Sequence, residues 1–219
     1  MTGSAAYTDR TRGLAGGDPS VRLRVALALG SAPDPRDVDP LVARCAVEPD
    51  FSVREMLTWA LTRHPAAVTV PRLVAELRSP QAQARSQALH TLSKIGDRAA
   101  WPALTVALLT DADDEVARAA WRAAVALVPS GAEAGLAGIL TTQLGRGDRG
   151  TWLSLARALA ALGEVVTPVL DAAASHPDPR VRAHAAATRQ LMRDPDAGFA
   201  FSIEEAKRVV ALGHADRQG

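Results

Sequence analysis

Acidic and basic side chains recur at a fixed spacing along this chain. A short segment starts at positions 18, 50, 81, 113, 148 and 178, with Asp as its first residue in all copies but one, which has Gln. Four of these copies carry Arg four residues later. An Asp in this position can accept hydrogen bonds from the free amide groups at the start of a helix, and the Arg can pair with a carboxylate. The chemistry that this spacing favours is structural.

The residues that most often perform catalysis or bind metals do not cluster. The five histidines lie in different repeats or in turns, without a His-Glu dipeptide or an i, i+4 pair: His64, His90, His176, His184 and His214. The single cysteine, Cys45, excludes an internal disulfide and a multi-cysteine zinc site, and it favours a reduced, intracellular setting. We therefore expect no metal and no cofactor, and we expect Cys45 to be a small buried residue.

The copies begin 30 to 35 residues apart, which is typical of stacked repeats rather than of one globular core. In most copies apolar residues follow at the fourth, eighth and twelfth positions, forming one stripe of a helix. Gly30, Gly96 and Gly163 are expected to end this first helix. A second helix is expected to begin at Pro40, Pro71, Pro102 and Pro168 in the respective repeats. Each repeat is thus predicted to be a helical hairpin, with helix A followed by helix B.

The repeat unit resembles the short HEAT-like repeats, which also occur in phycobilin lyases. Residues 18–30 read Asp-Pro-Ser-Val-Arg-Leu-Arg-Val-Ala-Leu-Ala-Leu-Gly and carry that motif nearly complete, and residues 84–96 followed by Pro102-Ala-Leu carry most of it. The resemblance implies an all-α fold, a right-handed α-solenoid of about six helical hairpins. We expect a flexible N-terminal segment over 1–17, the repeat array over 18–193, and a C-terminal capping helix and tail over 194–219.

Composition agrees with this fold class. Hydrophobic residues make up 47% of the 219 residues and aromatic residues only 4%, so Ala, Leu and Val must fill the core, as in closely packed helices. The net charge of +1 provides no global field for nucleic acid, which makes that ligand a minor alternative. Without a long apolar stretch no membrane partner is expected, and a cytoplasmic location is predicted.

Two sets of residues are candidates for roles beyond the core. The recurring Asp and Arg residues are interpreted as an Asp–Arg ladder between repeats, with a row of ligand-binding arginines as the alternative. Its members are Asp18, Arg22, Asp50, Arg54, Arg85, Asp178 and Arg182. The outward positions of helix B, on the concave face of such arrays, and an aromatic-basic patch are the predicted partner-binding surface. These residues are Arg44, Arg72, Glu76, Thr105, Asp171, Trp121 and Arg122.

The aromatic-basic patch combines Trp121 with Arg118, Arg122 and Arg157, although core filling is the first interpretation of a tryptophan here, because an Ala-rich helix interface needs an occasional large residue. The first hypothesis for function is a non-enzymatic scaffold that binds a protein or peptide through its helix-B face. One alternative is a HEAT-like DNA glycosylase acting on alkylated bases, with Asp113 or Asp114 and Trp121 as candidates. A further alternative is the handling of a chromophore, as in the phycobilin lyases.

Overall fold

The computed structural model describes residues 10–194, and within this range the chain forms helices and no strand. The fold divides into two compact units, Met1–Leu108 and Leu109–Gly219. In both units, helices from successive repeats lie side by side in two layers. Within the described part of the chain, the predicted all-α array of stacked hairpins is confirmed.

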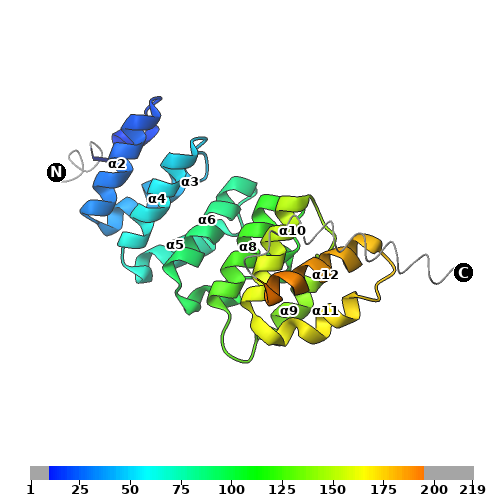
Figure 1. The fold of residues 1–219 in the computed structure, drawn as a ribbon. Coiled ribbons are helices and arrows are strands. Elements are labelled where there is room, and N and C mark those ends of the chain that lie inside the picture. Colours follow the sequence, from blue (N-terminus) through cyan, green and yellow to red (C-terminus); the bar gives the residue numbers. More distant parts are fainter. Residues whose placement is uncertain (1–9, 195–219) are drawn as a thin grey trace, which may run out of the picture. The chain divides into compact units, whose positions relative to one another are not determined.

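The first unit contains three A helices, α2 (Pro19–Ser31), α4 (Phe51–Arg63) and α6 (Ala82–Ile95), of which α4 packs against both others. The B helices α3 (Val38–Cys45) and α5 (Ala66–Glu76) pack on each other and form the second layer (Figure 1). Short 3-10 helices precede or connect them, namely η1 (Gly13–Ala15), η2 (Pro35–Asp37) and η3 (Arg98–Ala103). The short helix α7 (Val106–Leu109) reaches the first residue of the second unit.

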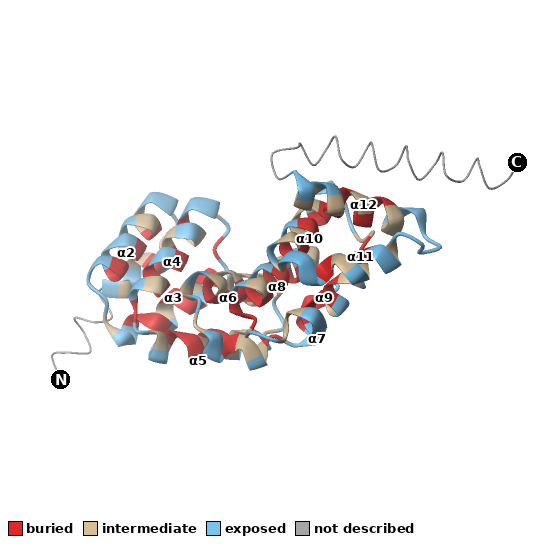
Figure 2. Ribbon diagram, turned by 60° about the horizontal axis from the view of Figure 1, so that its bottom comes forward, coloured by how far each residue is buried: buried red, intermediate tan, exposed pale blue. Residues whose placement is uncertain are grey.

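The second unit repeats this arrangement. Its A helices are α8 (Asp114–Leu127), α10 (Arg149–Ala161) and α12 (Pro179–Arg193), with α10 packed between the other two. Helices α9 (Glu133–Thr141) and α11 (Thr167–Ala173) form the second layer, and η4 (Gly163–Val166) leads into α11. Figure 2 shows that the buried residues in both units lie where the two layers face each other.

The A helices begin where the recurring Asp residues predict. The carboxylate of Asp50 accepts a hydrogen bond from the Val53 amide at 3.0 Å, and Asp18, Asp113, Asp148 and Asp178 cap their helices in the same way. The apolar stripe of the central helices is fully buried, as at Leu57, Leu61 and Leu92, which are at most 1% exposed. Asp capping and burial of the stripe together explain why these segments fold as packed helices.

Three of the predicted helix boundaries are wrong. Gly96 and Gly163 follow their helices with positive φ angles of 72° and 73°, as expected, but Gly30 lies inside α2, where it is buried against Trp59. Pro71 lies within α5, which starts directly after Pro65. Pro102 lies within η3, and the α-helix that follows starts only at Val106. From sequence alone, a glycine that permits close contact between helices looks the same as a glycine that ends a helix. A proline inside a helix likewise looks the same as a proline that begins one.

Part of the predicted flexible N-terminal segment packs against the repeats. Residues 10–17 belong to the predicted flexible segment, yet Leu14 in η1 is buried and Arg22 donates hydrogen bonds to the carbonyl groups of Gly16 and Gly17, both at 2.8 Å. This part of the segment is therefore packed against the array. The predicted capping helix lies in residues 195–219, outside the described residues.

Candidate functional site

A groove of about 410 Å³ lies between the A helices α8 and α10 of the second unit. Its apolar lining includes Val125 and Ala126 of α8 together with Leu153, Ala158 and Ala161 of α10. Ser154 and Gly150 complete the α10 side. Because adjacent A helices each present a row of side chains, small residues at the contact leave this space between the rows.

Three arginines line the same groove: Arg118 and Arg122 from α8, and Arg157 from α10. Arg122 and Arg157 are exposed, while Arg118 is half-buried and donates a hydrogen bond to Glu115 Oε1 at 2.8 Å. The described residues that line the groove include no Asp or Glu. The groove therefore combines an apolar floor with positive charge, and it brings together the three arginines that the sequence suggested for a basic patch.

Trp121 does not belong to this surface, so its assignment as a partner-binding residue is wrong. Its side chain is 0% exposed, and its indole Nε1 donates a hydrogen bond to the carbonyl oxygen of Leu109 at 2.8 Å. Trp121 is one helical residue, or about 100°, before Arg122, which turns the ring into the core while Arg122 reaches solvent. The interpretation of Trp121 as core filling is correct.

The candidates on the helix-B side of the first unit are engaged in internal ion pairs. Arg72 Nε lies 2.7 Å from Asp39 Oδ1, and Arg72 Nη1 lies 2.6 Å from Glu76 Oε1. Burial lowers the pKa of Arg72, but its hydrogen bonds with Glu76 and Asp39 outweigh that effect and raise it. The charges of Arg72 and Glu76 are thus already paired with neighbouring side chains.

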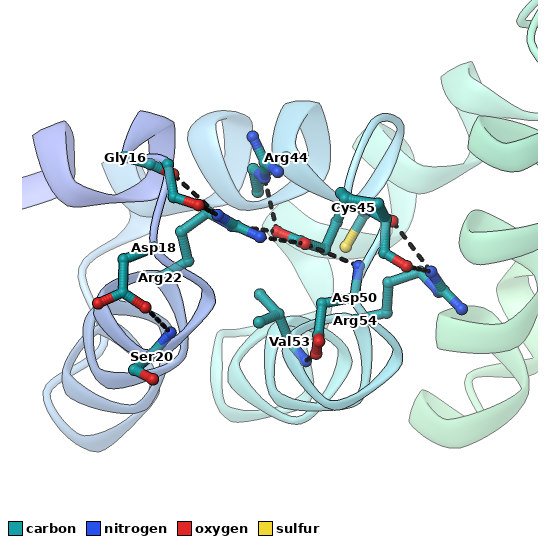
Figure 3. Close-up of polar contacts among 12 residues, drawn as sticks. Gly16, Asp18, Ser20, Arg22, Arg44, Cys45, Asp50, Val53 and Arg54 are labelled. Atoms are coloured by element: carbon teal, nitrogen blue, oxygen red, sulfur yellow. Dashed lines mark hydrogen bonds and ion pairs between the residues drawn. The ribbon is translucent and has the colours of Figure 1, made fainter.

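Arg44 is held similarly, because its Nε donates to Glu48 Oε2 at 2.8 Å. The same carboxylate receives two hydrogen bonds from Arg22, at 2.7 and 2.8 Å, and it also accepts one from the Asp50 amide at 2.9 Å. Figure 3 shows Arg22 and Arg44 converging from α2 and α3 on this one carboxylate. Burial raises the pKa of Glu48, but the bonds from both arginines outweigh it and hold the pKa at about 2.

The remaining two predicted partner-binding residues lie apart from the groove lining. Thr105 is exposed and its hydroxyl accepts a hydrogen bond from the Leu108 amide at 3.4 Å. Asp171 of α11 is half-exposed and pairs with Arg189 of α12 at 2.7 Å. Neither residue is among those that line the α8–α10 groove, and of the predicted set only Arg122 is.

The predicted Asp–Arg ladder has a different form in the structure. Arg54 Nη1 donates to the carbonyl groups of Glu48 and Pro49, six and five residues earlier, at 3.0 and 2.8 Å (Figure 3). The equivalent arginines make the same two bonds to the loop before their own helix, namely Arg22, Arg85 and Arg182. Among the described residues, Asp18, Asp50 and Asp178 cap helices and make no ion pair. The physical reason is reach: the loop carbonyls lie directly beside the helix start.

Sequence reasoning missed the side chains two residues before each repeat start. Glu48, Ser79, Asp111 and His176 each accept a hydrogen bond from the amide of the first repeat residue. The sequence pattern that could have revealed them is a polar or charged residue two positions before the repeat start in four of the repeats. Glu48 is the most consequential of them, because it is fully buried and links Arg22 to Arg44.

The isolated titratable residues perform structural roles. His184 is fully buried, stacks on Trp152 with ring centroids 4.5 Å apart, accepts a hydrogen bond from the Gly145 amide and donates one to the Trp152 carbonyl. Burial lowers the pKa of His184 to about 4, and burial raises the pKa of the Cys45 thiol to about 12. Within residues 10–194 there is no group of three or more His, Cys, Asp or Glu side chains that could hold a metal ion.

The repeats of stacked helical hairpins define the class of this protein, and comparison with known families identifies the type of repeat. Residues 48–126 match the family model described as HEAT repeats. The resemblance predicted from the sequence is thus confirmed over that range. No curated protein matches the chain.

Two solved structures are similar to this chain. One is the complex of CpcE and CpcF of phycocyanin lyase from Nostoc sp. PCC7120, with 20% identity, a TM-score of 0.48, and coverage of 94% of this chain and 86% of that chain. The other is an engineered protein, with 20% identity, a TM-score of 0.47, and coverage of 92% and 97%, respectively. Similarity at this level carries no information on what this chain binds.

The described helices are too short or too polar to cross a membrane singly. No single helix in this part of the chain is both long enough and apolar enough. The pair formed by residues 149–161 and 163–173 meets the requirement only when taken together, and it bends by 119° at the break.

Proposed function

We propose that this chain is a non-enzymatic scaffold that binds a protein partner through the α8–α10 groove. The observation that carries the proposal is the groove lining, in which an apolar floor is bordered by Arg118, Arg122 and Arg157. Protein interfaces commonly combine an apolar centre with arginines that contact the partner. HEAT repeats over residues 48–126 are consistent with a scaffold, and the buried free Cys45 supports a cytoplasmic location as part of the proposal.

This proposal moves the binding surface from the predicted helix-B face to the A helices of the second unit. Arg44 and Arg72 are paired with Glu48, Asp39 and Glu76, so a partner would have to break existing ion pairs to use them. The cost is greatest at Arg44, because its partner Glu48 is fully buried and would lose one of its two cationic partners. Arg157 forms no hydrogen bond or ion pair with another described residue, so its charge is available to a partner.

The residues suggested for a glycosylase have structural roles instead. Asp113 accepts hydrogen bonds from the Glu115 and Val116 amides, and Asp114 pairs with Arg146 at 2.7 Å. Trp121 is buried and cannot stack on a nucleotide. These contacts support the scaffold over the glycosylase.

Affinity capture from extracts of the source cell tests the proposal, with the full chain as bait and quantitative mass spectrometry as readout. The double variant Arg122→Glu/Arg157→Glu should lose a partner that the wild type captures. Arg24 and Arg63 are exposed arginines of the first unit that lie outside the groove lining. The control Arg24→Glu/Arg63→Glu carries the same change in net charge and should retain the partner.

The outcome also distinguishes the two faces. Loss of the partner from Arg44→Glu/Arg72→Glu, with full capture by the groove variant, would place the binding surface on the helix-B face and contradict the proposal. Release of alkylated bases from DNA by the purified chain would contradict the non-enzymatic assignment. Circular dichroism and thermal melting of every variant separate lost binding from lost folding.

A further inference from the structure

The dimensions of the α8–α10 groove limit what can occupy it. Its lining runs from Arg118 to Ala126 on α8 and from Gly150 to Ala161 on α10, which at the rise of an α-helix corresponds to about 12 Å and about 16 Å. Neighbouring helices are typically about 8–10 Å apart, so the space between their outer rows accepts one row of side chains. An occupant of matching length is a helix of about three turns that inserts one narrow apolar stripe.

The charged residues of the groove determine which side chains of the occupant can lie next to its apolar stripe. Arg122 lies on the α8 side of the groove and Arg157 on the α10 side, and both are exposed. A ligand that inserts here therefore meets a guanidinium group on each side, and the described lining contains no carboxylate. Carboxylates on both flanks of the apolar stripe would pair with these arginines, whereas Lys or Arg at the same positions would be repelled.

We infer that the occupant of the α8–α10 groove is an acidic amphipathic helix of a partner protein, with a narrow apolar stripe flanked by Glu or Asp on both sides. The inference rests on the proposed function and specifies its partner. The apolar row contacts Val125, Ala126, Ala158 and Ala161, and the flanking carboxylates contact Arg122 and Arg157. This is the helix-in-groove mode of recognition, in which residues at i, i+3, i+4 and i+7 anchor the ligand.

A nucleic acid fits this surface less well. Binding of a nucleic acid relies on a long basic track, often with aromatic rings on which bases stack, whereas this groove has three arginines, of which Arg118 is already paired with Glu115, and no aromatic residue in the described part of its lining. The test therefore includes a single-stranded oligonucleotide, whose tight binding to the groove would overturn the inference.

The direct experiment measures binding of a fluorescein-labelled synthetic peptide to the full chain by fluorescence anisotropy. The peptide is a 14-residue helical design with Leu and Ala at i, i+3, i+4 and i+7, and with Glu at the positions on either side. A matched peptide has Gln in place of every Glu. The acidic peptide is expected to bind roughly tenfold or more tightly than the Gln peptide, and its affinity should fall with added salt because exposed charges are screened.

Variants of the chain then locate the binding. Arg122→Glu/Arg157→Glu should weaken binding of the acidic peptide by roughly tenfold or more, while Arg24→Glu/Arg63→Glu should leave it within about twofold. Ala126→Phe fills the apolar floor without changing charge, and it should also weaken binding. Equal affinity of both peptides, or full binding by the groove variants, would overturn the inference.

The same peptides separate failure of this inference from failure of the proposed function. If capture yields a partner lost in the groove variant, while the acidic peptide does not bind, the scaffold assignment stands and the helix class is wrong. If neither a captured partner nor the peptide depends on the groove, both are wrong. Tighter peptide binding by Glu204→Gln/Glu205→Gln than by wild type would mean that a segment of this chain itself occupies the groove, which also overturns the inference.

Discussion

The outer faces of the A helices differ between the two units at the same repeat position. Nine residues after the repeat start, α2 and α4 carry Leu27 and Trp59, whereas α8 and α10 carry Arg122 and Arg157. In the first unit a Cβ at Gly30 would lie 2.4 Å from the Trp59 ring, so the ring closes the space between α2 and α4. In the second unit the arginines extend to solvent and the space stays open as a groove.

This difference shows how one repeat can produce both a closed and an open surface. The Asp caps and the apolar stripe recur in both units, whereas the outer-face residue differs: Trp59, seated against Gly30, covers α2 and α4, and Arg122 and Arg157 border an open groove between α8 and α10. An aromatic ring gains free energy by covering apolar neighbours, while a guanidinium keeps its charged end hydrated. Changes at this position should therefore alter binding without altering the fold.

The largest expected loss of stability comes from removing a tryptophan of the core, and it should exceed the loss from removing one at the surface. Trp121→Ala should lower the free energy of unfolding by about 3–5 kcal/mol, because it leaves a cavity and removes the donor to the Leu109 carbonyl. Trp59 is 38% exposed, so Trp59→Ala should cost about 1–2 kcal/mol. Urea unfolding followed by circular dichroism measures both. Equal losses would mean that the two rings contribute alike and that the contrast between the units is wrong.

The two units should also lose stability at different pH. The pKa of His184 is lowered from 6.5 to about 4, so the folded chain binds fewer protons than the unfolded chain between these values. Protonation of the buried ring therefore costs stability: this cost is absent above pH 6.5 and grows to about 3 kcal/mol as the pH falls to about 4. The pKa of Glu48 in the first unit is lowered from 4.5 to about 2, so its stabilising contribution is lost only between those values.

Free energies of unfolding measured from pH 8 to pH 3 test this order. The variant His184→Gln should lose the pH dependence between 6.5 and 4 and keep the dependence below pH 4.5. Glu48→Gln should keep the dependence between pH 6.5 and 4 and weaken the dependence below pH 4.5, to which Asp34 and Asp148 also contribute because their pKa values are lowered. A wild-type stability that stays constant from pH 6.5 to 5 would contradict the assignment for His184.

A smaller effect concerns the glycine under Trp59. Gly30→Ala should destabilise the chain by about 1–3 kcal/mol, because the new methyl group would lie 2.8 Å from the Ala60 Cα, which belongs to the backbone and cannot rotate away. Gly138 in α9 has open space around it, so Gly138→Ala should stabilise by about 0.5–1 kcal/mol through helix propensity. Thermal melting of both variants gives the sign directly, and a stabilised Gly30→Ala protein would refute the close contact.

The smallest predicted loss of stability concerns the hydrogen bonds from arginine to the entry loop, which occur in both units. Arg54→Ala and Arg182→Ala each remove two hydrogen bonds to a loop, and each should cost about 1–2 kcal/mol. The exposed Arg63 provides the control, because Arg63→Ala should stay within about 0.5 kcal/mol of wild type. Chemical denaturation resolves these values. A loss in one unit only would mean that the loop contact does not serve both.

Much of the fold followed from local chemistry, whereas the site did not. Asp capping and the apolar stripe depend on neighbouring residues in the chain, so spacing alone located the A helices. An A helix packed between neighbours buries more than one stripe of side chains. A shift of one position along the helix therefore decides whether a tryptophan such as Trp121 or Trp59 faces the core or the surface. The pairing of Arg44 with Glu48, and of Arg72 with Asp39, required knowledge of which helices meet.

The loop bonds of Arg22, Arg54, Arg85 and Arg182 have a consequence for how such a chain can lengthen. Each guanidinium fastens its helix to the carbonyl groups of the two loop residues that lie five and six positions earlier, so a repeat carries the means of fixing its own entry loop. A gene duplication that copies about 32 codons would copy this fastening as well. The inserted unit would need no compensating change in the flanking repeats to set its loop, which makes tandem duplication a short mutational route to a longer array.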